Sequence, residues 1–395
     1  MDHLPTHRAV PNDAERLARL RLARTDRIGP ATYQRLMHHC GTARAAVAAL
    51  PDLARRGGGA APSLCPEAVA RRELARAHEL GAQLIFLGEP SYPPLLALLP
   101  DAPPCLTVLG DPAVLHRHGV AIVGSRNASA GGCLIADTLA ETLAAGGYPV
   151  VSGLARGIDT AAHTGALRRG ITVAAVAGGV DVPYPQENTA LQARIAEAGA
   201  VVAEAPLGTA PQSRHFPRRN RIIAGLALGV VVVEAAPRSG SLITARIALE
   251  AGRELFAVPG SPLDPRCLGT NDLIRQGAHL TERAADILDN LPTHPLAAGV
   301  RRLPLFAHAD AAPSGFAEAQ NAGIPPAEPD PALRAEIARL LGMAPVSVDD
   351  LVLHCQVSAA AVTAVLLELE LAGNARLLPG NRVTAEMLPA QEWDA

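Results

Sequence analysis

Short apolar runs recur at regular spacing through the middle of the chain, and this alternation constrains its fold more than any other feature. Most of the runs are followed by a turn of small residues and then by a helical pattern. Buried strands that alternate with helices predict right-handed crossovers and a mostly parallel sheet with helices on both faces. We therefore expect an α/β core. The runs are Val120–Val123, Pro149–Ser152, Thr172–Ala177, Val201–Glu204, Val230–Glu234 and Leu255–Val258.

The segments on either side of this core have different patterns, and a further strand is expected at Gln83–Leu87, before a Pro-rich turn. Composition shifts divide the chain of 395 residues into four parts. They are an N-terminal helical domain at 1–73, the core at 74–290, a Pro- and Ala-rich linker at 291–330, and a winged-helix domain at 331–395.

The N-terminal segment from 12 to 56 has a helical pattern throughout. Around Gly29-Pro30 it resembles the hairpin of a helix-hairpin-helix element, in which helix N–H groups can meet a DNA phosphate. A small helical bundle with a Gly-Pro turn explains the same residues, and we favour it because the motif is short. The three glycines at 57–59 predict a flexible break.

The C-terminal segment predicts two helices followed by a hairpin wing at Leu377–Val383. Ser358 is the expected N-cap of the second helix, which runs to about Leu371. A helix at this position in a winged-helix domain commonly reads DNA, yet this one carries no Arg and two Glu. A protein-docking or structural role is therefore favoured over DNA binding.

The composition is that of a globular protein, with 49% hydrophobic and 18% charged residues. No apolar run is long enough to span a bilayer, and the N-terminus lacks the apolar core of a signal peptide. The six cysteines are scattered without a C-x-x-C pair, which argues against a zinc site or a disulfide framework. We expect a cytoplasmic protein.

The chain contains no lysine, so all 35 of its basic residues are arginine, and its net charge is −3. A Walker-A nucleotide site, Schiff-base catalysis and pyridoxal phosphate chemistry each need a lysine, and all three are excluded. The common catalytic motifs are also missing from the sequence. We expect no catalytic residue, no cofactor and no metal, and any bound phosphate must be held by arginine, hydroxyl or backbone N–H groups.

Turns with small residues follow the predicted strands, and four of five carry arginine. Ligands of open parallel sheets bind at the carboxyl ends of the strands, where these turns lie. One such turn alone fits tight strand-to-helix packing, but five on one edge predict an anion site. The candidate binding residues in these turns are Gly124, Ser125, Arg126, Arg156, Arg214, Arg218, Arg219, Asn220, Arg221, Arg238, Ser239, Gly240 and Ser241.

Two further features of these turns each allow two interpretations. Phe216 stands among the arginines and can serve as a ring on which a DNA base stacks, or as a hydrophobic staple at a helix entrance. Asp159 and His163 are four residues apart and can pair on one helix face. We interpret this second pair as structural, because the sequence places no nucleophile or metal ligand beside it.

Together these segments resemble the DprA (Smf) family of DNA-processing proteins. The resemblance rests on Gly124-Ser125-Arg126, on Ser152–Asp159 with His163, on Phe216–Leu226, on Arg238–Ala245 and on Val258-Pro259-Gly260, in that order. It covers roughly residues 80–290, and the flanking modules resemble those of longer family members.

The resemblance implies an extended Rossmann-like fold, a homodimer and a non-catalytic role. That role is to bind incoming single-stranded DNA and to help load the RecA recombinase during natural transformation. Family contacts with single strands correspond here to Arg126, Phe216, Arg219 and Arg221. Some relatives also use lysines in this pocket, and this chain has Gln186 where a basic residue occurs in some of them.

Two other functions fit parts of the sequence less well. A phosphoribohydrolase of the lysine-decarboxylase-like group would carry a P-G-G-x-G-T-x-x-E motif, and Arg238–Thr244 lacks both the doubled glycine and the acid. A regulator of double-stranded DNA would act through the winged helix, whose acidic second helix argues against it.

Overall fold

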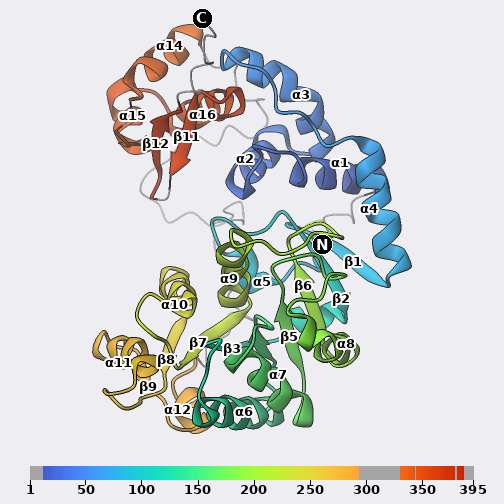
Figure 1. Ribbon diagram of the computed structural model, residues 1–395. Coiled ribbons are helices and arrows are strands. Elements are labelled where there is room, and N and C mark those ends of the chain that lie inside the picture. Colours follow the sequence, from blue (N-terminus) through green and yellow to red (C-terminus); the bar gives the residue numbers. More distant parts are fainter. Residues whose placement is uncertain (1–11, 293–329, 343, 379, 387–395) are drawn as a thin grey trace, which may run out of the picture. The chain divides into compact units, whose positions relative to one another are not determined.

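The computed structural model describes residues 12–292, 330–342, 344–378 and 380–386. They form two compact units (Figure 1). One unit combines the N-terminal residues up to Ala70 with the C-terminal residues from 330 onward, and the other begins at Arg71 and contains the α/β core. Nearly all of the predicted linker at 291–330 lies outside the described residues.

The core is a nine-stranded sheet with the order β1-β2-β6-β5-β4-β3-β7-β8-β9. The strands from β6 to β9 in this order are parallel, whereas β1 and β2 are antiparallel to their neighbours. This confirms the predicted mostly parallel α/β sheet. The strands are β1 Ala82–Phe86, β2 Cys105–Gly110, β3 Gly119–Gly124, β4 Val150–Ser152, β5 Thr172–Ala175, β6 Ala200–Ala203, β7 Ala227–Val233, β8 Glu254–Ala257 and β9 His279–Leu280.

Helices cover both faces of the sheet, because alternate strand residues are buried on opposite sides (Figure 1). In β3, Val120 and Ile122 join one apolar cluster while Ala121 and Val123 join the other. The first cluster includes α6 Ala130–Ala145, α7 Ile158–Arg169 and α12 Ala284–Leu288, and the second includes α5 Pro94–Ala97, α9 His215–Gly225, α10 Gly240–Glu250 and α11 Leu268–Arg275. Helix α8 Thr189–Ala198 packs its Ile195 into a third cluster beside β5 and β6.

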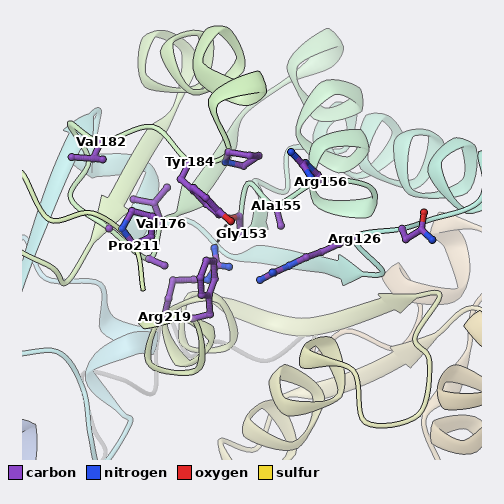
Figure 2. Close-up of a pocket in the computed structure, with 14 residues that line it drawn as sticks. Arg126, Gly153, Ala155, Arg156, Val176, Val182, Tyr184, Pro211 and Arg219 are labelled. Atoms are coloured by element: carbon purple, nitrogen blue, oxygen red, sulfur yellow. Dashed lines mark hydrogen bonds between the residues drawn. The ribbon is translucent and has the colours of Figure 1, made fainter. Parts of the chain in front are cut away.

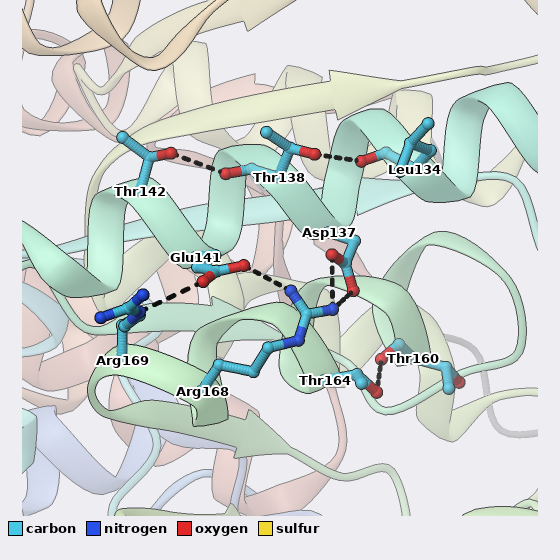
Figure 3. A network of polar contacts seen from close by, with 9 residues as sticks. All are labelled: Leu134, Asp137, Thr138, Glu141, Thr142, Thr160, Thr164, Arg168 and Arg169. Atoms are coloured by element: carbon cyan, nitrogen blue, oxygen red, sulfur yellow. Dashed lines mark hydrogen bonds and ion pairs between the residues drawn. The ribbon is translucent and has the colours of Figure 1, made fainter.

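A network of ion pairs joins α6 to α7 on the outside of the core (Figure 3). Arg168 donates to Asp137 at 2.6 Å and to Glu141 at 2.5 Å, and Arg169 donates to Glu141 at 3.3 Å. The side chains of both arginines are exposed to solvent. They hold two helices together, so we do not count them among the cations available to a ligand.

The terminal unit contains the predicted N-terminal helices, with α1 Asp13–Ala23, α2 Pro30–Cys40 and α3 Ala43–Arg56, and the start of α4 Glu67–Glu79. Asn12 caps α1 and Thr42 caps α3, each through its side-chain oxygen. Gly29 and Pro30 begin α2 as predicted. Leu22, Tyr33 and Leu36 are fully or almost fully buried in a small apolar core.

The C-terminal part of this unit is a winged helix, as predicted. Ser358 caps the second helix by accepting a hydrogen bond from the Ala361 backbone N–H. The elements are α14 Pro331–Leu340, β10 Val346–Ser347, α15 Val348–Cys355, α16 Ala359–Ala372, β11 Ala375–Leu378 and β12 Arg382–Ala385. No single helix in the described ranges is long and apolar enough to cross a membrane; α15 and α16 reach that length only as a pair bent by 117°.

Helix α16 packs against the N-terminal helices within this unit. Leu367 and Leu371 belong to the same apolar cluster as Tyr33 and Leu36. The glycines at 57 and 59 lie against the backbone of α16, and a Cβ atom on either would overlap it. The flexible break predicted for 57–59 is therefore replaced by a close contact between helices, which only residues without a side chain allow.

Candidate nucleic-acid interface

A cavity of about 340 Å³ opens where strands β3, β4 and β5 end (Figure 2). The chain runs from β3 through β4 and β5 to β6 on one side of β3 and then returns to its other side with β7. Such a reversal of strand order is where α/β sheets bind ligands. The segments that follow β3, β4, β5 and β6 supply the walls together with α9. The lining residues are Arg126, Asn127, Gly153, Ala155, Arg156, Val176, Ala177, Gly178, Val182, Tyr184, Pro185, Pro211, Phe216 and Arg219.

Arg126 and Phe216 form the centre of this pocket. The guanidinium carbon of Arg126 lies 4.7 Å from the centre of the Phe216 ring, a cation–π contact. Arg126 is exposed and makes no ion pair with any described residue. The Tyr184 ring contacts the Phe216 ring edge-on, and the two ring centroids are 5.9 Å apart. A free cation and two rings therefore share one wall.

The Phe216 ring lies within α9, one residue after the helix begins at His215. A hydrophobic staple uses the residue before the N-cap, which here is Ser213. The staple interpretation of Phe216 therefore does not fit this geometry, and its ring contacts pocket residues instead.

Arg219 forms the buried end of the pocket, and Figure 2 shows Arg126 extending toward it. It is 6% exposed and donates to the backbone oxygens of Gly153 and of Ala175, the latter at 2.5 Å. Its Nε is buried and has no hydrogen-bond partner among the described residues. A Cβ atom at Gly153 would overlap the guanidinium in this position, so the absence of a side chain there leaves room for Arg219.

Burial lowers the pKa of Arg219 to about 10, an effect that the nearby Asp159 carboxylate opposes. Arg219 therefore stays a cation at neutral pH. Burial also raises the pKa of Asp159, against the attraction of Arg219, and the Asp159 carboxylate accepts a hydrogen bond from the Ala155 N–H at 3.3 Å. Asp159 thus holds the loop after β4 and lies beside the buried charge of Arg219.

His163 lies behind this pair and is fully buried. Its Nδ1 is 2.7 Å from the Thr172 hydroxyl, which itself donates to the Val150 oxygen at 2.6 Å. The hydroxyl proton is committed to Val150, so we assign the imidazole proton to Nδ1. Burial, with a smaller contribution from Arg219, lowers the pKa of His163 to about 3, and the ring is neutral at physiological pH.

Arg156 stands at the rim of the pocket and is paired with a carboxylate. Its Nε and Nη2 donate to the two oxygens of Glu187 at 2.6 and 2.8 Å. These two hydrogen bonds and the charge of Glu187 raise the pKa of Arg156. Arg156 is thus a cation at the rim of the pocket, and two of its guanidinium nitrogens already donate to Glu187.

Arg221 lies outside the pocket, although it is only two residues from Arg219. Its Nη2 donates to both Glu204 oxygens at 2.6 Å, and its Nη1 lies 3.4 Å from Asp101. The side chain is 7% exposed. These contacts make Arg221 a brace between α9 and the end of β6, and we leave it out of the proposed DNA contacts.

The other predicted residues do not line the pocket. Arg214 and Arg218 are exposed at the start of α9, and Asn220 lies 3.4 Å from the Gly240 oxygen, at the turn where α10 begins. The hydroxyls of Ser239 and Ser241 are 2.9 Å apart in that turn, beside the exposed Arg238. Gly124 and Ser125 shape the turn that carries Arg126, and the Ser125 oxygen accepts from the Ile158 N–H at 3.2 Å. Of the candidate residues, Arg126, Arg156, Phe216 and Arg219 meet in the cavity.

Tyr184 and Gly153 line the cavity but were missing from the predicted set. Both lie in turns that follow predicted strands, so position at a strand end was the available signal. In the described part of the chain, no group of three or more His, Cys, Asp or Glu side chains is placed to hold a metal ion.

Comparison with known families matches three models to this chain. Residues 83–292 match "DNA recombination-mediator protein A", residues 13–76 match "DprA-like N-terminal HHH domain", and residues 321–381 match "DprA winged helix domain". The three ranges together include the α/β core and both flanking modules.

Individual relatives agree with these matches. Protein Smf of Escherichia coli is 42% identical over 294 residues, covering 74% of each chain. DNA processing protein DprA of Bacillus subtilis is 43% identical over 223 residues, or 56% of this chain and 75% of the relative. The crystal structure of DprA from Streptococcus pneumoniae superposes with a TM-score of 0.61 at 33% identity, over 72% of this chain and all of that one.

Proposed function

Because this chain belongs to the DprA (Smf) family of DNA recombination-mediator proteins, we propose that it binds single-stranded DNA at the pocket between β3, β4, β5 and α9. In this proposal the protein holds DNA for recombination and performs no chemistry on it. We further propose a cytoplasmic homodimer that helps to load the RecA recombinase onto the strand. The family membership and the relatives named as DNA-processing proteins support this wider role.

The contact between Arg126 and Phe216 carries the proposal. A single strand exposes both phosphates and unpaired bases, and proteins that bind it combine a basic track with rings for stacking. Arg126 supplies a cation without a carboxylate partner, and Phe216 and Tyr184 supply rings beside it. The buried Arg219 adds positive charge at the inner end, while Arg214 and Arg218 extend it along the start of α9.

A duplex fits the same site less well, because its bases are stacked and paired and cannot reach a ring inside a cavity. Helix α16 offers no alternative for duplex binding. Glu368 is 1% exposed and bound to Arg334 at 2.7 Å, and the residues of α16 that remain exposed are small and uncharged. We therefore expect preference for single strands.

The test measures binding of a labelled oligothymidylate by fluorescence anisotropy over a range of salt concentrations. We expect log K to fall against log salt with a slope of roughly −3, if about four phosphates are neutralised. Replacing Arg126 by Ala should weaken binding and leave thermal unfolding unchanged. Arg194→Ala is the matched control, since Arg194 is exposed on α8 and does not line the pocket. Equal affinity of folded R126A and R194A would refute this site, and equal affinity for single strands and duplex would refute the proposed preference.

A further inference from the structure

We propose that Glu187 competes with DNA for Arg156 and thereby limits the affinity of the pocket for single strands. The inference rests on the proposed function and assigns Glu187 a part in it as a residue that regulates binding.

Glu187 binds Arg156 with the same geometry that a phosphate would use. Two neighbouring guanidinium nitrogens of Arg156 donate to the two Glu187 oxygens, at 2.6 and 2.8 Å. Arginine binds phosphate through the same fork of two parallel hydrogen bonds. A DNA phosphate and the Glu187 carboxylate therefore need the same face of the same side chain, and they cannot both occupy it.

The pair is also accessible to an incoming strand. The side chain of Arg156 is 64% exposed and that of Glu187 is 52% exposed. Exposed ion pairs of this kind contribute little to stability, so exchange for another anion is easy. Arg156 and Arg126 line the same cavity, so a strand bound there can contact both.

The position of Glu187 is fixed by the next residue in the chain. Asn188 is 5% exposed, and its side-chain amide donates to the Leu154 oxygen at 2.9 Å and to the Thr160 hydroxyl at 2.8 Å. Leu154 precedes Arg156 in the loop after β4, and Thr160 follows it in the first turn of α7. These two bonds tie the short helix at Gln186–Asn188 to that loop, so Glu187 is held opposite Arg156.

The three pocket cations therefore differ in what neutralises them. Arg126 has no carboxylate partner among the described residues, and Arg219 is buried beside Asp159, whose charge is enclosed with it. Arg156 alone combines exposure with a carboxylate that DNA can displace. Removing the charge of Glu187 should free the Arg156 guanidinium to bind a DNA phosphate.

The test is the affinity of the full chain for a labelled oligothymidylate, compared between Glu187→Gln and Glu197→Gln. Glu197 is exposed on α8 and does not line the pocket, so both variants change the net charge equally. We expect E187Q to bind roughly two- to fivefold more tightly than E197Q at low salt, which is the range for one exposed ion pair. The salt dependence should become steeper, because one more cation contacts phosphate.

A double-variant cycle separates this effect from others. In an Arg156→Ala background, E187Q should give no gain beyond that of E197Q. A gain that persists there, or an E187Q variant that binds no better than E197Q, overturns the inference, as does weaker binding by E187Q, which would mean that Glu187 orients Arg156 for DNA. Glu187→Ala repeats the test should E187Q unfold. Wild-type protein that fails to bind single strands would overturn the proposed function itself, and with it this inference.

Discussion

Arg35 on α2 donates a hydrogen bond to Glu370 on α16 at 2.5 Å, with both side chains less than one-fifth exposed. This pair joins the N-terminal helices to the winged helix inside one compact unit. Burial raises the pKa of Glu370, although Arg35 lowers it. Glu370 is one of the two acidic residues that argue against DNA binding by α16, and it has an ion-pair partner within the protein.

Reversing the charge of Arg35 should destabilise this unit. In Arg35→Glu, two partly buried carboxylates face each other, and we expect a loss of about 2 kcal/mol or more in the free energy of unfolding. Faster hydrogen exchange of the α2 and α16 amides would report it. The double variant Arg35→Glu/Glu370→Arg should recover part of the loss.

The matched control is Arg55→Glu, which breaks the Arg55–Asp52 pair on the surface of α3, where the two side chains are 76% and 56% exposed. Such a pair contributes little, so exchange in α2 and α16 should stay near that of the wild type. Equal effects of R35E and R55E would contradict a specific role for the pair between the two modules.

The substitution Gly57→Ala should loosen the packing of α16 against the N-terminal helices. The new Cβ atom would overlap the Glu368 backbone oxygen and contact Ala372, so α16 must move away. Overpacking of this kind costs about 1–3 kcal/mol. Gly342→Ala is the control, because its Cβ atom meets nothing within 4 Å. Thermal unfolding by calorimetry should separate the two variants, and coincident melting curves would show that the contact is adaptable.

Arg221 should matter for stability and not for DNA binding. Arg221→Ala leaves Glu204 without its two hydrogen bonds and opens space under α9, at a cost of about 2 kcal/mol or more. Below its melting temperature the folded variant should bind single strands as the wild type does. A folded R221A protein with greatly reduced affinity would place Arg221 in the DNA site after all.

The division between Arg219 and Arg221 shows what could be predicted from sequence. The spacing of the apolar runs was enough to predict the parallel sheet. The turns at the strand ends indicated the pocket residues Arg126, Arg156, Phe216 and Arg219. Sequence could not distinguish Arg219 from Arg221, because the partners of both come from distant segments. Arg219 donates to Gly153 and Ala175, whereas Arg221 contacts Glu204 and Asp101. Strand β2 escaped prediction because prolines precede it and it lies antiparallel in the outer part of the sheet.

Replacing Phe216 should distinguish stacking from simple packing. Phe216→Ala removes the ring and should weaken single-strand binding by about 1–3 kcal/mol, the range for one stacked base. Phe216→Leu keeps an apolar side chain without a π face and should lose nearly as much, whereas Phe216→Tyr should bind almost as tightly as the wild type. Anisotropy titrations of the three variants provide the measurement. Full affinity in F216L would show that the ring only fills space.

The neutral His163 should make the core sensitive to acid. Its pKa is about 3 in the folded protein and 6.5 as the ordinary value, so the unfolded chain binds the proton more readily. Stability from this residue is therefore complete above pH 6.5 and falls as the pH drops from 6.5 toward 3. At about pH 5 the loss should be on the order of 2 kcal/mol. In His163→Gln, which can still donate to Thr172, the free energy of unfolding should depend less steeply on pH over this range. Parallel pH profiles of denaturant unfolding for the two proteins would mean that His163 is protonated in the folded state, beside the cation of Arg219.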